Sequence, residues 1–175
     1  MSPAYPFAPP AGREPLAQLR YGADELASGA VAAQRIAAPP ERVWRTLTAM
    51  WSEGGWVPLV RRIRRAGDLI TVDLRFRIAL FSAGFQYVAR VVADEPRSLE
   101  LAWCEGEPRD MQIRFDLLPD ADGAATLLYV HSGFDITSLG WLVKLVLKHH
   151  PEIRAGVHAG IALVLADQVR RRSGG

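Results

Sequence analysis

The stretch from residue 57 to residue 134 constrains the fold most, because apolar and polar residues alternate along one segment after another. In LITVDLRFRIAL, residues 69–80, positions 70, 72, 74, 76 and 78 are apolar, and the positions between them are polar or charged. A period of two is typical of a β-strand that buries one face. Short turns such as PDADG at 119–123 separate the segments. The pattern therefore predicts an antiparallel meander.

One face of the predicted sheet carries bulky side chains. The expected strands cover residues 30–37, 57–65, 69–80, 85–93, 99–104, 111–118 and 124–134, with Ser82-Ala83-Gly84 as a hairpin turn. Their apolar phase places five aromatic residues on the same face: Phe76, Phe85, Tyr87, Trp103 and Phe115. The last segment is apolar on both faces through Tyr129 and Val130, which fits a strand lying under a helix. Such a face either fills a core or lines a pocket.

A helix is expected directly after the first strand, in RIAAPPERVWRTLTAMWSEGGW, residues 35–56. Proline lacks the N–H that a strand ladder needs but suits the first turn of a helix, so Pro40 begins the helix. Apolar residues then recur near helical spacing, namely Val43, Trp44, Leu47, Met50 and Trp51. Gly54-Gly55 breaks the segment before Trp56.

The C-terminal region predicts one long helix that Ser138 caps and that runs to about Arg172, with a kink at Pro151. Its second half carries a stripe expected to face the core: Ile153, Val157, Ile161, Val164, Leu165 and Gln168. Its first part, residues 139–148, is apolar nearly all round apart from Lys144 and Lys148. A long helix against the apolar face of an antiparallel sheet predicts an α+β fold that encloses space between them.

Composition and charge exclude several classes of function. The net charge of +2 is too small to indicate a nucleic-acid partner. The single cysteine, Cys104, cannot form an internal disulfide and fits a reducing compartment. The Pro-rich N-terminal arm, residues 1–28, has no secretory signal pattern, although residues 16–28 fit a short helix. We therefore expect a cytoplasmic protein.

The chain resembles the START-like superfamily, also called SRPBCC, which includes the birch pollen allergen and polyketide cyclase/dehydrase groups. The resemblance rests on IAAPPERVWRTLT at 36–48, on the Trp51–Trp56 stretch, on the strand meander and on SLGWLVKLVLKHHPEIRAGVHAGIALVLADQVRRR at 138–172. It covers residues 29–172, which would form a ligand-binding domain. It implies a helix-grip fold: a curved sheet of about seven strands gripping the C-terminal helix, with two short helices after the first strand.

The resemblance also implies a hydrophobic cavity that the short helices gate, so the Trp-rich segment looks like a lid. The inward phases of the elements place eight expected ligand-binding residues around that cavity: Trp56, Phe76, Phe85, Tyr87, Trp103, Phe115, Val157 and Ile161. Trp51 of the lid and His131 of the last strand complete the expected set. The resemblance does not imply a particular reaction, since members of the superfamily bind lipids, sterols, quinones, hormones or polyketides and only some are enzymes.

Few residues suit catalysis or metal binding. His131 in the last strand, with Tyr87 and Tyr129, could move protons in a cavity. His150 and His158 lie eight residues apart on a helix, about 12 Å at 1.5 Å per residue, so they cannot share one zinc ion. We therefore expect no metal. The sequence also has no Gly-rich phosphate loop and no Gly-x-Ser-x-Gly nucleophile elbow, and we expect no cofactor.

The sequence therefore predicts a soluble binder or carrier of a small hydrophobic ligand, such as a lipid, quinone, sterol or polyketide-like molecule. One alternative is a cyclase/dehydrase-type enzyme that acts on a polyketide-like substrate in the same cavity. A second alternative is a peripheral membrane or partner-docking module that makes transient membrane contact through residues 139–148. The single histidine expected in the cavity favours the binder, since an enzyme needs at least two convergent titratable groups.

Overall fold

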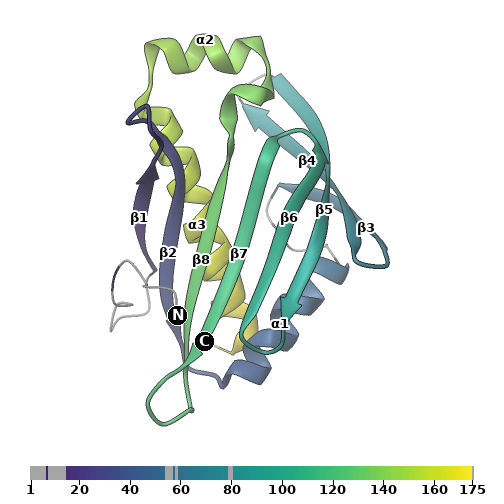
Figure 1. Cartoon of the computed structure of the whole chain (residues 1–175), viewed down its shortest axis with the longest axis vertical. Helices are drawn as coiled ribbons and strands as arrows, with labels where there is room; N and C mark the ends of the chain where they lie inside the picture. Colours follow the sequence, from purple (N-terminus) through teal and green to yellow (C-terminus); the bar gives the residue numbers. More distant parts are fainter. Residues whose placement is uncertain (1–6, 8–14, 54–56, 58, 79–80, 175) are drawn as a thin grey trace.

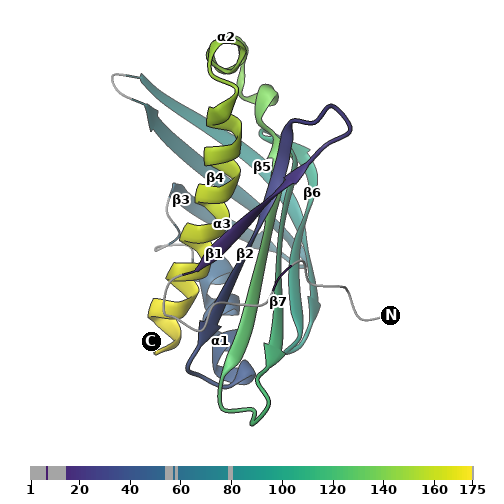
Figure 2. The same ribbon diagram turned by 90° about the vertical axis from the view of Figure 1, so that its left-hand side faces the viewer.

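A curved antiparallel sheet wrapped on one long helix forms the body of the protein (Figure 1, Figure 2). The computed structural model describes residues 7, 15–53, 57, 59–78 and 81–174, without the side chains of residues 53, 76–78, 81 and 82. In chain order the elements are β1 (Leu16–Tyr21), β2 (Ala27–Ile36), α1 (Pro40–Glu53), β3 (Val60–Ala66), β4 (Leu69–Ile78), β5 (Phe81–Asp94), β6 (Ser98–Gly106), β7 (Arg109–Pro119), β8 (Thr126–Asp135), the 3-10 turn η1 (Ile136–Leu139), α2 (Trp141–His149) and α3 (Glu152–Ser173).

The sheet topology confirms the predicted α+β helix-grip architecture, with eight strands instead of about seven. The strand order is β1-β2-β8-β7-β6-β5-β4-β3. Each of these neighbouring pairs is antiparallel in the described residues. Strands β3 to β8 follow one another as a meander, and β2 returns to pair with the last strand. The meander expected from the period of two is therefore correct.

The additional strand, β1, lies where the sequence had indicated an arm with a short helix. Residues 16–21 pair with β2, and the register shifts between Arg20 and Tyr21. Most of β1 is exposed, so its position depends on backbone hydrogen bonds to β2 rather than on a buried face. The helix predicted over residues 16–28 was wrong because Leu16, Leu19 and Leu26 are too few to override an available sheet edge.

The β4–β5 hairpin also differs from the expectation. Ser82, Ala83 and Gly84 belong to β5 and do not form the turn, since the ladder continues to the pair of Ile78 and Phe81. Small residues within a long strand have the composition of a turn, which explains the error. The hairpin is therefore longer than the sequence indicated.

One 14-residue helix, α1, stands where two short helices had been expected after the first long strand. Its apolar side is buried, with Val43, Leu47 and Met50 at 0% exposure. The Thr126 hydroxyl donates a hydrogen bond to the Ala38 carbonyl at 2.7 Å, which ties the turn before α1 to the start of β8. The helix therefore closes one end of the sheet (Figure 1).

The C-terminal helix is broken, not kinked, at Pro151. Asp135, not Ser138, makes the first cap, because its carboxylate accepts from the Thr137 N–H at 2.9 Å. His150 has φ −137° and ψ 67°, which is not helical. The following Pro151 explains this, because a proline disfavours the helical conformation of the residue before it. As a result α2 lies across the end of the sheet while α3 runs along it (Figure 1). No helix of the described residues is long and apolar enough to cross a bilayer.

Helix α3 packs against β2, β8 and β1 through small residues. Ala162 and Ala166 are fully buried, and in β2, against which α3 packs, Ala30 and Ala32 are also at 0% exposure. The buried stripe of α3 comprises His158, Ala162, Leu165, Ala166, Val169 and Ser173. The predicted stripe was therefore rotated, since Ile153 and Val164 are 40% and 42% exposed. Alanine allows close approach of helix and sheet, which the apolar pattern alone did not show.

Candidate ligand site

The candidate site lies on the inner face of the sheet, defined here as the face turned toward α3 and α1. Seven of the predicted ligand-binding residues belong to one hydrophobic cluster there: Trp51, Phe85, Tyr87, Trp103, Phe115, Val157 and Ile161. They come from α1, β5, β6, β7 and α3, so the fold brings together residues that are far apart in sequence. Trp56 lies outside the described residues, and Phe76 lies in β4 with its side chain outside them.

The residues of this cluster differ in how deeply they are buried. Trp51 and Phe115 lie next to each other with ring centroids 6.3 Å apart, and both are buried. Phe85, Trp103, Val157 and Ile161 are only partly buried although they pack against the core. The partly buried residues come from α3 and from strands β5 and β6, and they form the part of the cluster that solvent or a ligand can reach.

Trp103 is held in place at the end of β6. Its indole N–H donates a hydrogen bond to the Gly106 carbonyl at 3.3 Å. Gly106 has φ +95°, and a Cβ there would collide with the Gln86 carbonyl and with the backbone of Tyr87. Only glycine fits this close approach without strain. The Trp103 ring is thereby fixed on the inner face opposite Ala89.

Tyr87 is the one predicted acid–base candidate on the inner face. Its side chain is 1% exposed, and burial raises the pKa of the phenol above its ordinary value. The phenol therefore stays neutral at physiological pH. In that state it can donate a hydrogen bond to a ligand but cannot serve as a base.

His131 and Tyr129 lie on the outer face, away from Tyr87, so the predicted placement of His131 in the cavity wall is corrected. Their neighbours Leu128 and Val130 point inward and are fully buried. The Tyr129 hydroxyl donates to the Phe7 carbonyl at 3.0 Å. Strand β8 is apolar on both faces, so the alternation of its residues could not show which face is turned toward α3.

A charged network surrounds His131 on the outer face. The His131 Nε2 atom lies 3.1 Å from an Asp116 carboxylate oxygen, and Arg114 Nε donates to Asp116 at 2.9 Å. Burial alone would raise the pKa of Asp116, but its hydrogen bonds to His131 and Arg114 outweigh burial and hold the pKa below its ordinary value. This arrangement stabilises the outer face and does not open into the apolar cluster.

Sequence reasoning missed His158 as an interior residue. It lies on the buried stripe of α3 at 1% exposure, and burial lowers the pKa of its imidazole to about 4. Its phase with Ala162 and Leu165 is the signal that could have indicated burial. His149 and His150 are exposed, so the three histidines are not brought together. The described residues contain no group of three or more His, Cys, Asp or Glu side chains arranged for a metal ion.

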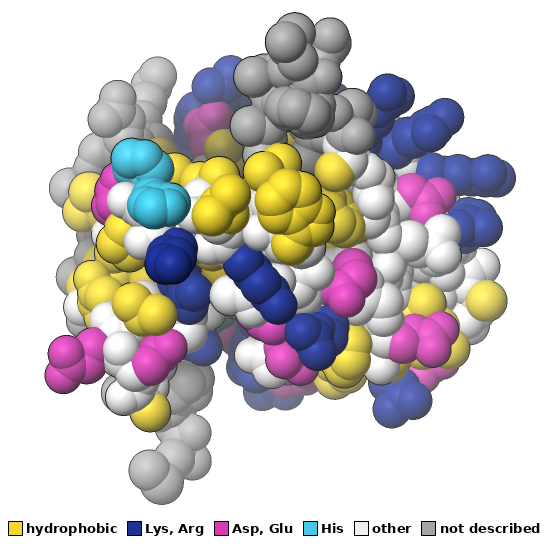
Figure 3. All heavy atoms as spheres, turned by 90° about the horizontal axis from the view of Figure 1, so that it is seen from above, with side chains coloured by type: hydrophobic (Ala, Val, Ile, Leu, Met, Phe, Trp, Pro, Cys, Tyr) yellow, Lys and Arg dark blue, Asp and Glu magenta, His cyan; other side chains and the backbone are white. Residues whose placement is uncertain are grey.

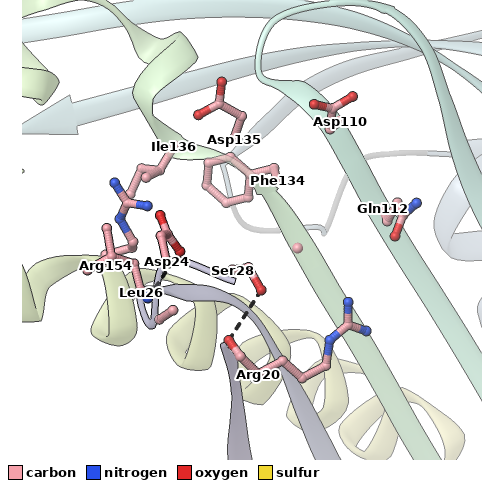
Figure 4. Close-up of a pocket in the computed structure, with 12 residues that line it drawn as sticks. Arg20, Asp24, Leu26, Ser28, Asp110, Gln112, Phe134, Asp135, Ile136 and Arg154 are labelled. Atoms are coloured by element: carbon pink, nitrogen blue, oxygen red, sulfur yellow. Dashed lines mark hydrogen bonds between the residues drawn. The ribbon is translucent and has the colours of Figure 1, made fainter. Parts of the chain in front are cut away.

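A hollow of about 400 Å³ lies between the β1–β2 hairpin, the start of β7, the end of β8 and the start of α3 (Figure 4). Carboxylates of Asp24 and Asp110 and the guanidinium groups of Arg20 and Arg154 line it, with Gln112 on one side. An apolar ligand would leave these charged groups without water or partners, which is costly. The polar hollow is therefore not the site for an apolar molecule.

Comparison with solved structures shows a START-like helix-grip fold. A conserved protein from Geobacillus kaustophilus superimposes with a TM-score of 0.60 at 17% identity, covering 82% of this chain and 93% of that one. The Zhui aromatase/cyclase from Streptomyces sp. R1128 gives 0.52 at 17% identity, covering 83% and 96%. A START superfamily protein from Mycobacterium smegmatis gives 0.51 at 16% identity, covering 81% and 96%. No protein-family model and no curated protein sequence matches the chain.

Proposed function

We propose that the protein binds and carries a small hydrophobic molecule, such as a lipid, quinone, sterol or polyketide-like compound, between its sheet and α3. The observation that carries this proposal is that partly buried apolar side chains from three elements pack against one hydrophobic cluster: Phe85 of β5, Trp103 of β6, and Val157 and Ile161 of α3. Removing apolar surface from water contributes about 25 cal/mol for each Å². An apolar ligand is the occupant that gains most from this surface.

The position of α3 supports the same proposal. The helix packs closely on β2 and β8, at one side of the inner face. Strands β5 and β6 lie farther across the curved sheet, with β8 and β7 between them and β2, and Phe85 and Trp103 are only partly buried where they pack against the same cluster. Ligand pockets in proteins are mostly lined by apolar and aromatic groups with few polar ones, and these four side chains are of that kind.

The enzyme alternative has less support from the described residues. Of His131, Tyr87 and Tyr129, only Tyr87 faces the inner side. Acid–base catalysis needs at least two convergent titratable groups with suitable pKa values. The aromatase/cyclase named above shares the fold at 17% identity, which does not bring its activity to this chain.

The proposal is tested by native mass spectrometry of the purified protein, followed by extraction and identification of any bound molecule. We expect one apolar molecule per chain, which returns when the delipidated protein is mixed with the extract. Titration with the neutral fluorescent probe N-phenyl-1-naphthylamine provides the affinity. A delipidated protein that binds neither the extract nor the probe, while circular dichroism shows it folded, would overturn the proposal.

A further inference from the structure

Helix α2 exposes an unusual amount of apolar surface for a helix that lies at one end of the protein. Trp141 is 75% exposed, Leu142 is 43% and Leu145 is 47%. Figure 3 looks down on this end and shows apolar side chains gathered over α2, with Lys and His side chains beside them. Large exposed apolar patches are uncommon on soluble proteins and mark contact surfaces.

The helix uses a different side for its contact with the body. Val143 and Leu147, one turn apart, pack against the hydrophobic core, and Leu147 is 8% exposed. At 100° per residue, Trp141 and Leu145 lie on the opposite side of the helix from these two. The outward apolar side chains are therefore not needed to hold α2 in place.

Lysines lie along one margin of the outward apolar side, and α2 contains no acidic residue. Lys144 and Lys148 lie one turn apart at one margin of the outward side. His149 follows in the last turn. An apolar strip with an exposed tryptophan, bordered by lysines, is the pattern of helices that lie in a membrane interface.

The geometry of the chain presents this strip sideways. Gly140, with φ +108°, precedes α2, and the break at Pro151 follows it. Because the chain turns at both ends of the helix, α2 lies across the end of the protein instead of pointing away from it (Figure 1). A helix in this orientation can set its whole length against a plane.

We propose that α2 docks the protein on a lipid bilayer whose surface carries anionic headgroups. The positive charge without acidic neighbours in the helix complements such headgroups, and each Lys near the surface adds attraction. A stable protein partner would require about 800 Å² on each side, more than one nine-residue helix offers. The purpose assigned to this contact, exchange of a hydrophobic ligand with the bilayer, rests on the proposed function, but the contact itself does not.

The test is co-sedimentation of the full chain with vesicles of phosphatidylcholine alone or with phosphatidylglycerol added. We expect binding to the anionic vesicles that weakens as salt rises from about 0.1 M to about 0.5 M, because salt screens headgroup attraction. Leu145→Glu should lower the partition coefficient roughly tenfold by placing a charge in the apolar strip. Lys144→Gln with Lys148→Gln should remove most of the preference for anionic vesicles.

The matched control is Leu16→Glu in β1. Leu16 is also an exposed leucine, at 54%, but it does not belong to α2. This variant should sediment like the parent. Parent protein that stays in solution with anionic vesicles at low salt would overturn the proposal, as would equal effects of the two Leu→Glu changes. A loss of self-association in Leu145→Glu, measured by analytical ultracentrifugation without vesicles, would instead assign α2 to a second copy of the chain.

Probe binding separates this proposal from the proposed function. Leu145→Glu should bind N-phenyl-1-naphthylamine like the parent in the absence of vesicles, since residue 145 lies outside the apolar cluster between sheet and α3. If the parent protein binds vesicles but not the probe, the carrier function is refuted and the docking role of α2 stands. If it binds the probe but not the vesicles, the docking role is refuted and the carrier function stands.

Discussion

The His158 ring stands edge-on to the Phe134 ring, with centroids 5.0 Å apart and an interplanar angle of 68°. Neither ring nitrogen of His158 has a hydrogen-bond partner among the described residues. Desolvation lowers its pKa from 6.5 to about 4, and the charges of Arg154 and Arg20 act in the same direction. The imidazole is therefore neutral in the folded protein at physiological pH.

This arrangement predicts a loss of stability in mild acid. The unfolded chain takes up a proton at His158 near pH 6.5 and the folded chain only near pH 4, so protonation favours unfolding between these values. From pH 7 to pH 5 the loss amounts to about 2 kcal/mol from this residue. Urea unfolding of the parent and of His158→Leu at both pH values measures it. An equal pH dependence in the two proteins would show that His158 is not the cause.

Trp103→Ala should weaken probe binding by about tenfold or more, because it removes a large apolar face and any aromatic stacking with the ligand. His131→Ala should change the affinity by less than about threefold, since one hydrogen bond contributes only about 1 kcal/mol and His131 lies on the outer face. Titration with N-phenyl-1-naphthylamine after a folding check compares them. Parental affinity in Trp103→Ala would place the ligand elsewhere.

Asp116→Ala should destabilise the fold by about 2 kcal/mol, because it leaves Arg114 and His131 without their shared carboxylate. The partly exposed partners can regain water, so the loss stays below that of a fully buried pair. Asp68→Ala provides the control, since its pair with Arg90 is exposed on both sides. Chemical denaturation should show a large loss for the first variant only, with probe binding unchanged in both.

Gly106→Ala should reduce both stability and probe binding. A methyl group there meets the backbone of Gln86 and Tyr87 and displaces the strand end that holds Trp103. Gly67→Ala, which also has positive φ but open space around its Cβ position, should cost only about 1 kcal/mol. Thermal unfolding and probe titration of the two variants distinguish the cost of placing alanine at positive φ, which both share, from the cost of the steric collision, which only Gly106→Ala has. Equal losses would mean that the close approach at Gly106 is unimportant.

The parts of the fold with a clear period of two were predictable from sequence. Strands β4 and β7 alternate strictly, so Leu74 and Phe115 were assigned to the correct face. Strand β8 is apolar on both faces, and nothing local placed His131 outside. The identity of β1 depended on a free edge of β2, which is a property of the assembled sheet and not of residues 16–21.

The helical region shows a second limit. Pro151 indicated an interruption, but whether a helix bends or breaks depends on the packing of Val143 and Leu147 against the body. The burial of His158 likewise required knowing that α3 faces the sheet through alanines. The alternation of a strand predicted which of its residues face α3. The face of α3 that packs on the sheet was not predictable, because alanines and not large apolar residues form that contact.

The alanines between α3 and β2 set how closely the helix approaches the sheet. Ala30 and Ala32 of β2 and Ala162 and Ala166 of α3 are fully buried in one cluster, on two elements that pack together. A larger side chain there has no free volume to occupy, so Ala32→Val should displace α3 from β2. Under the proposed carrier function, this displacement should also change the size of the apolar molecule that binds beside Phe85 and Trp103.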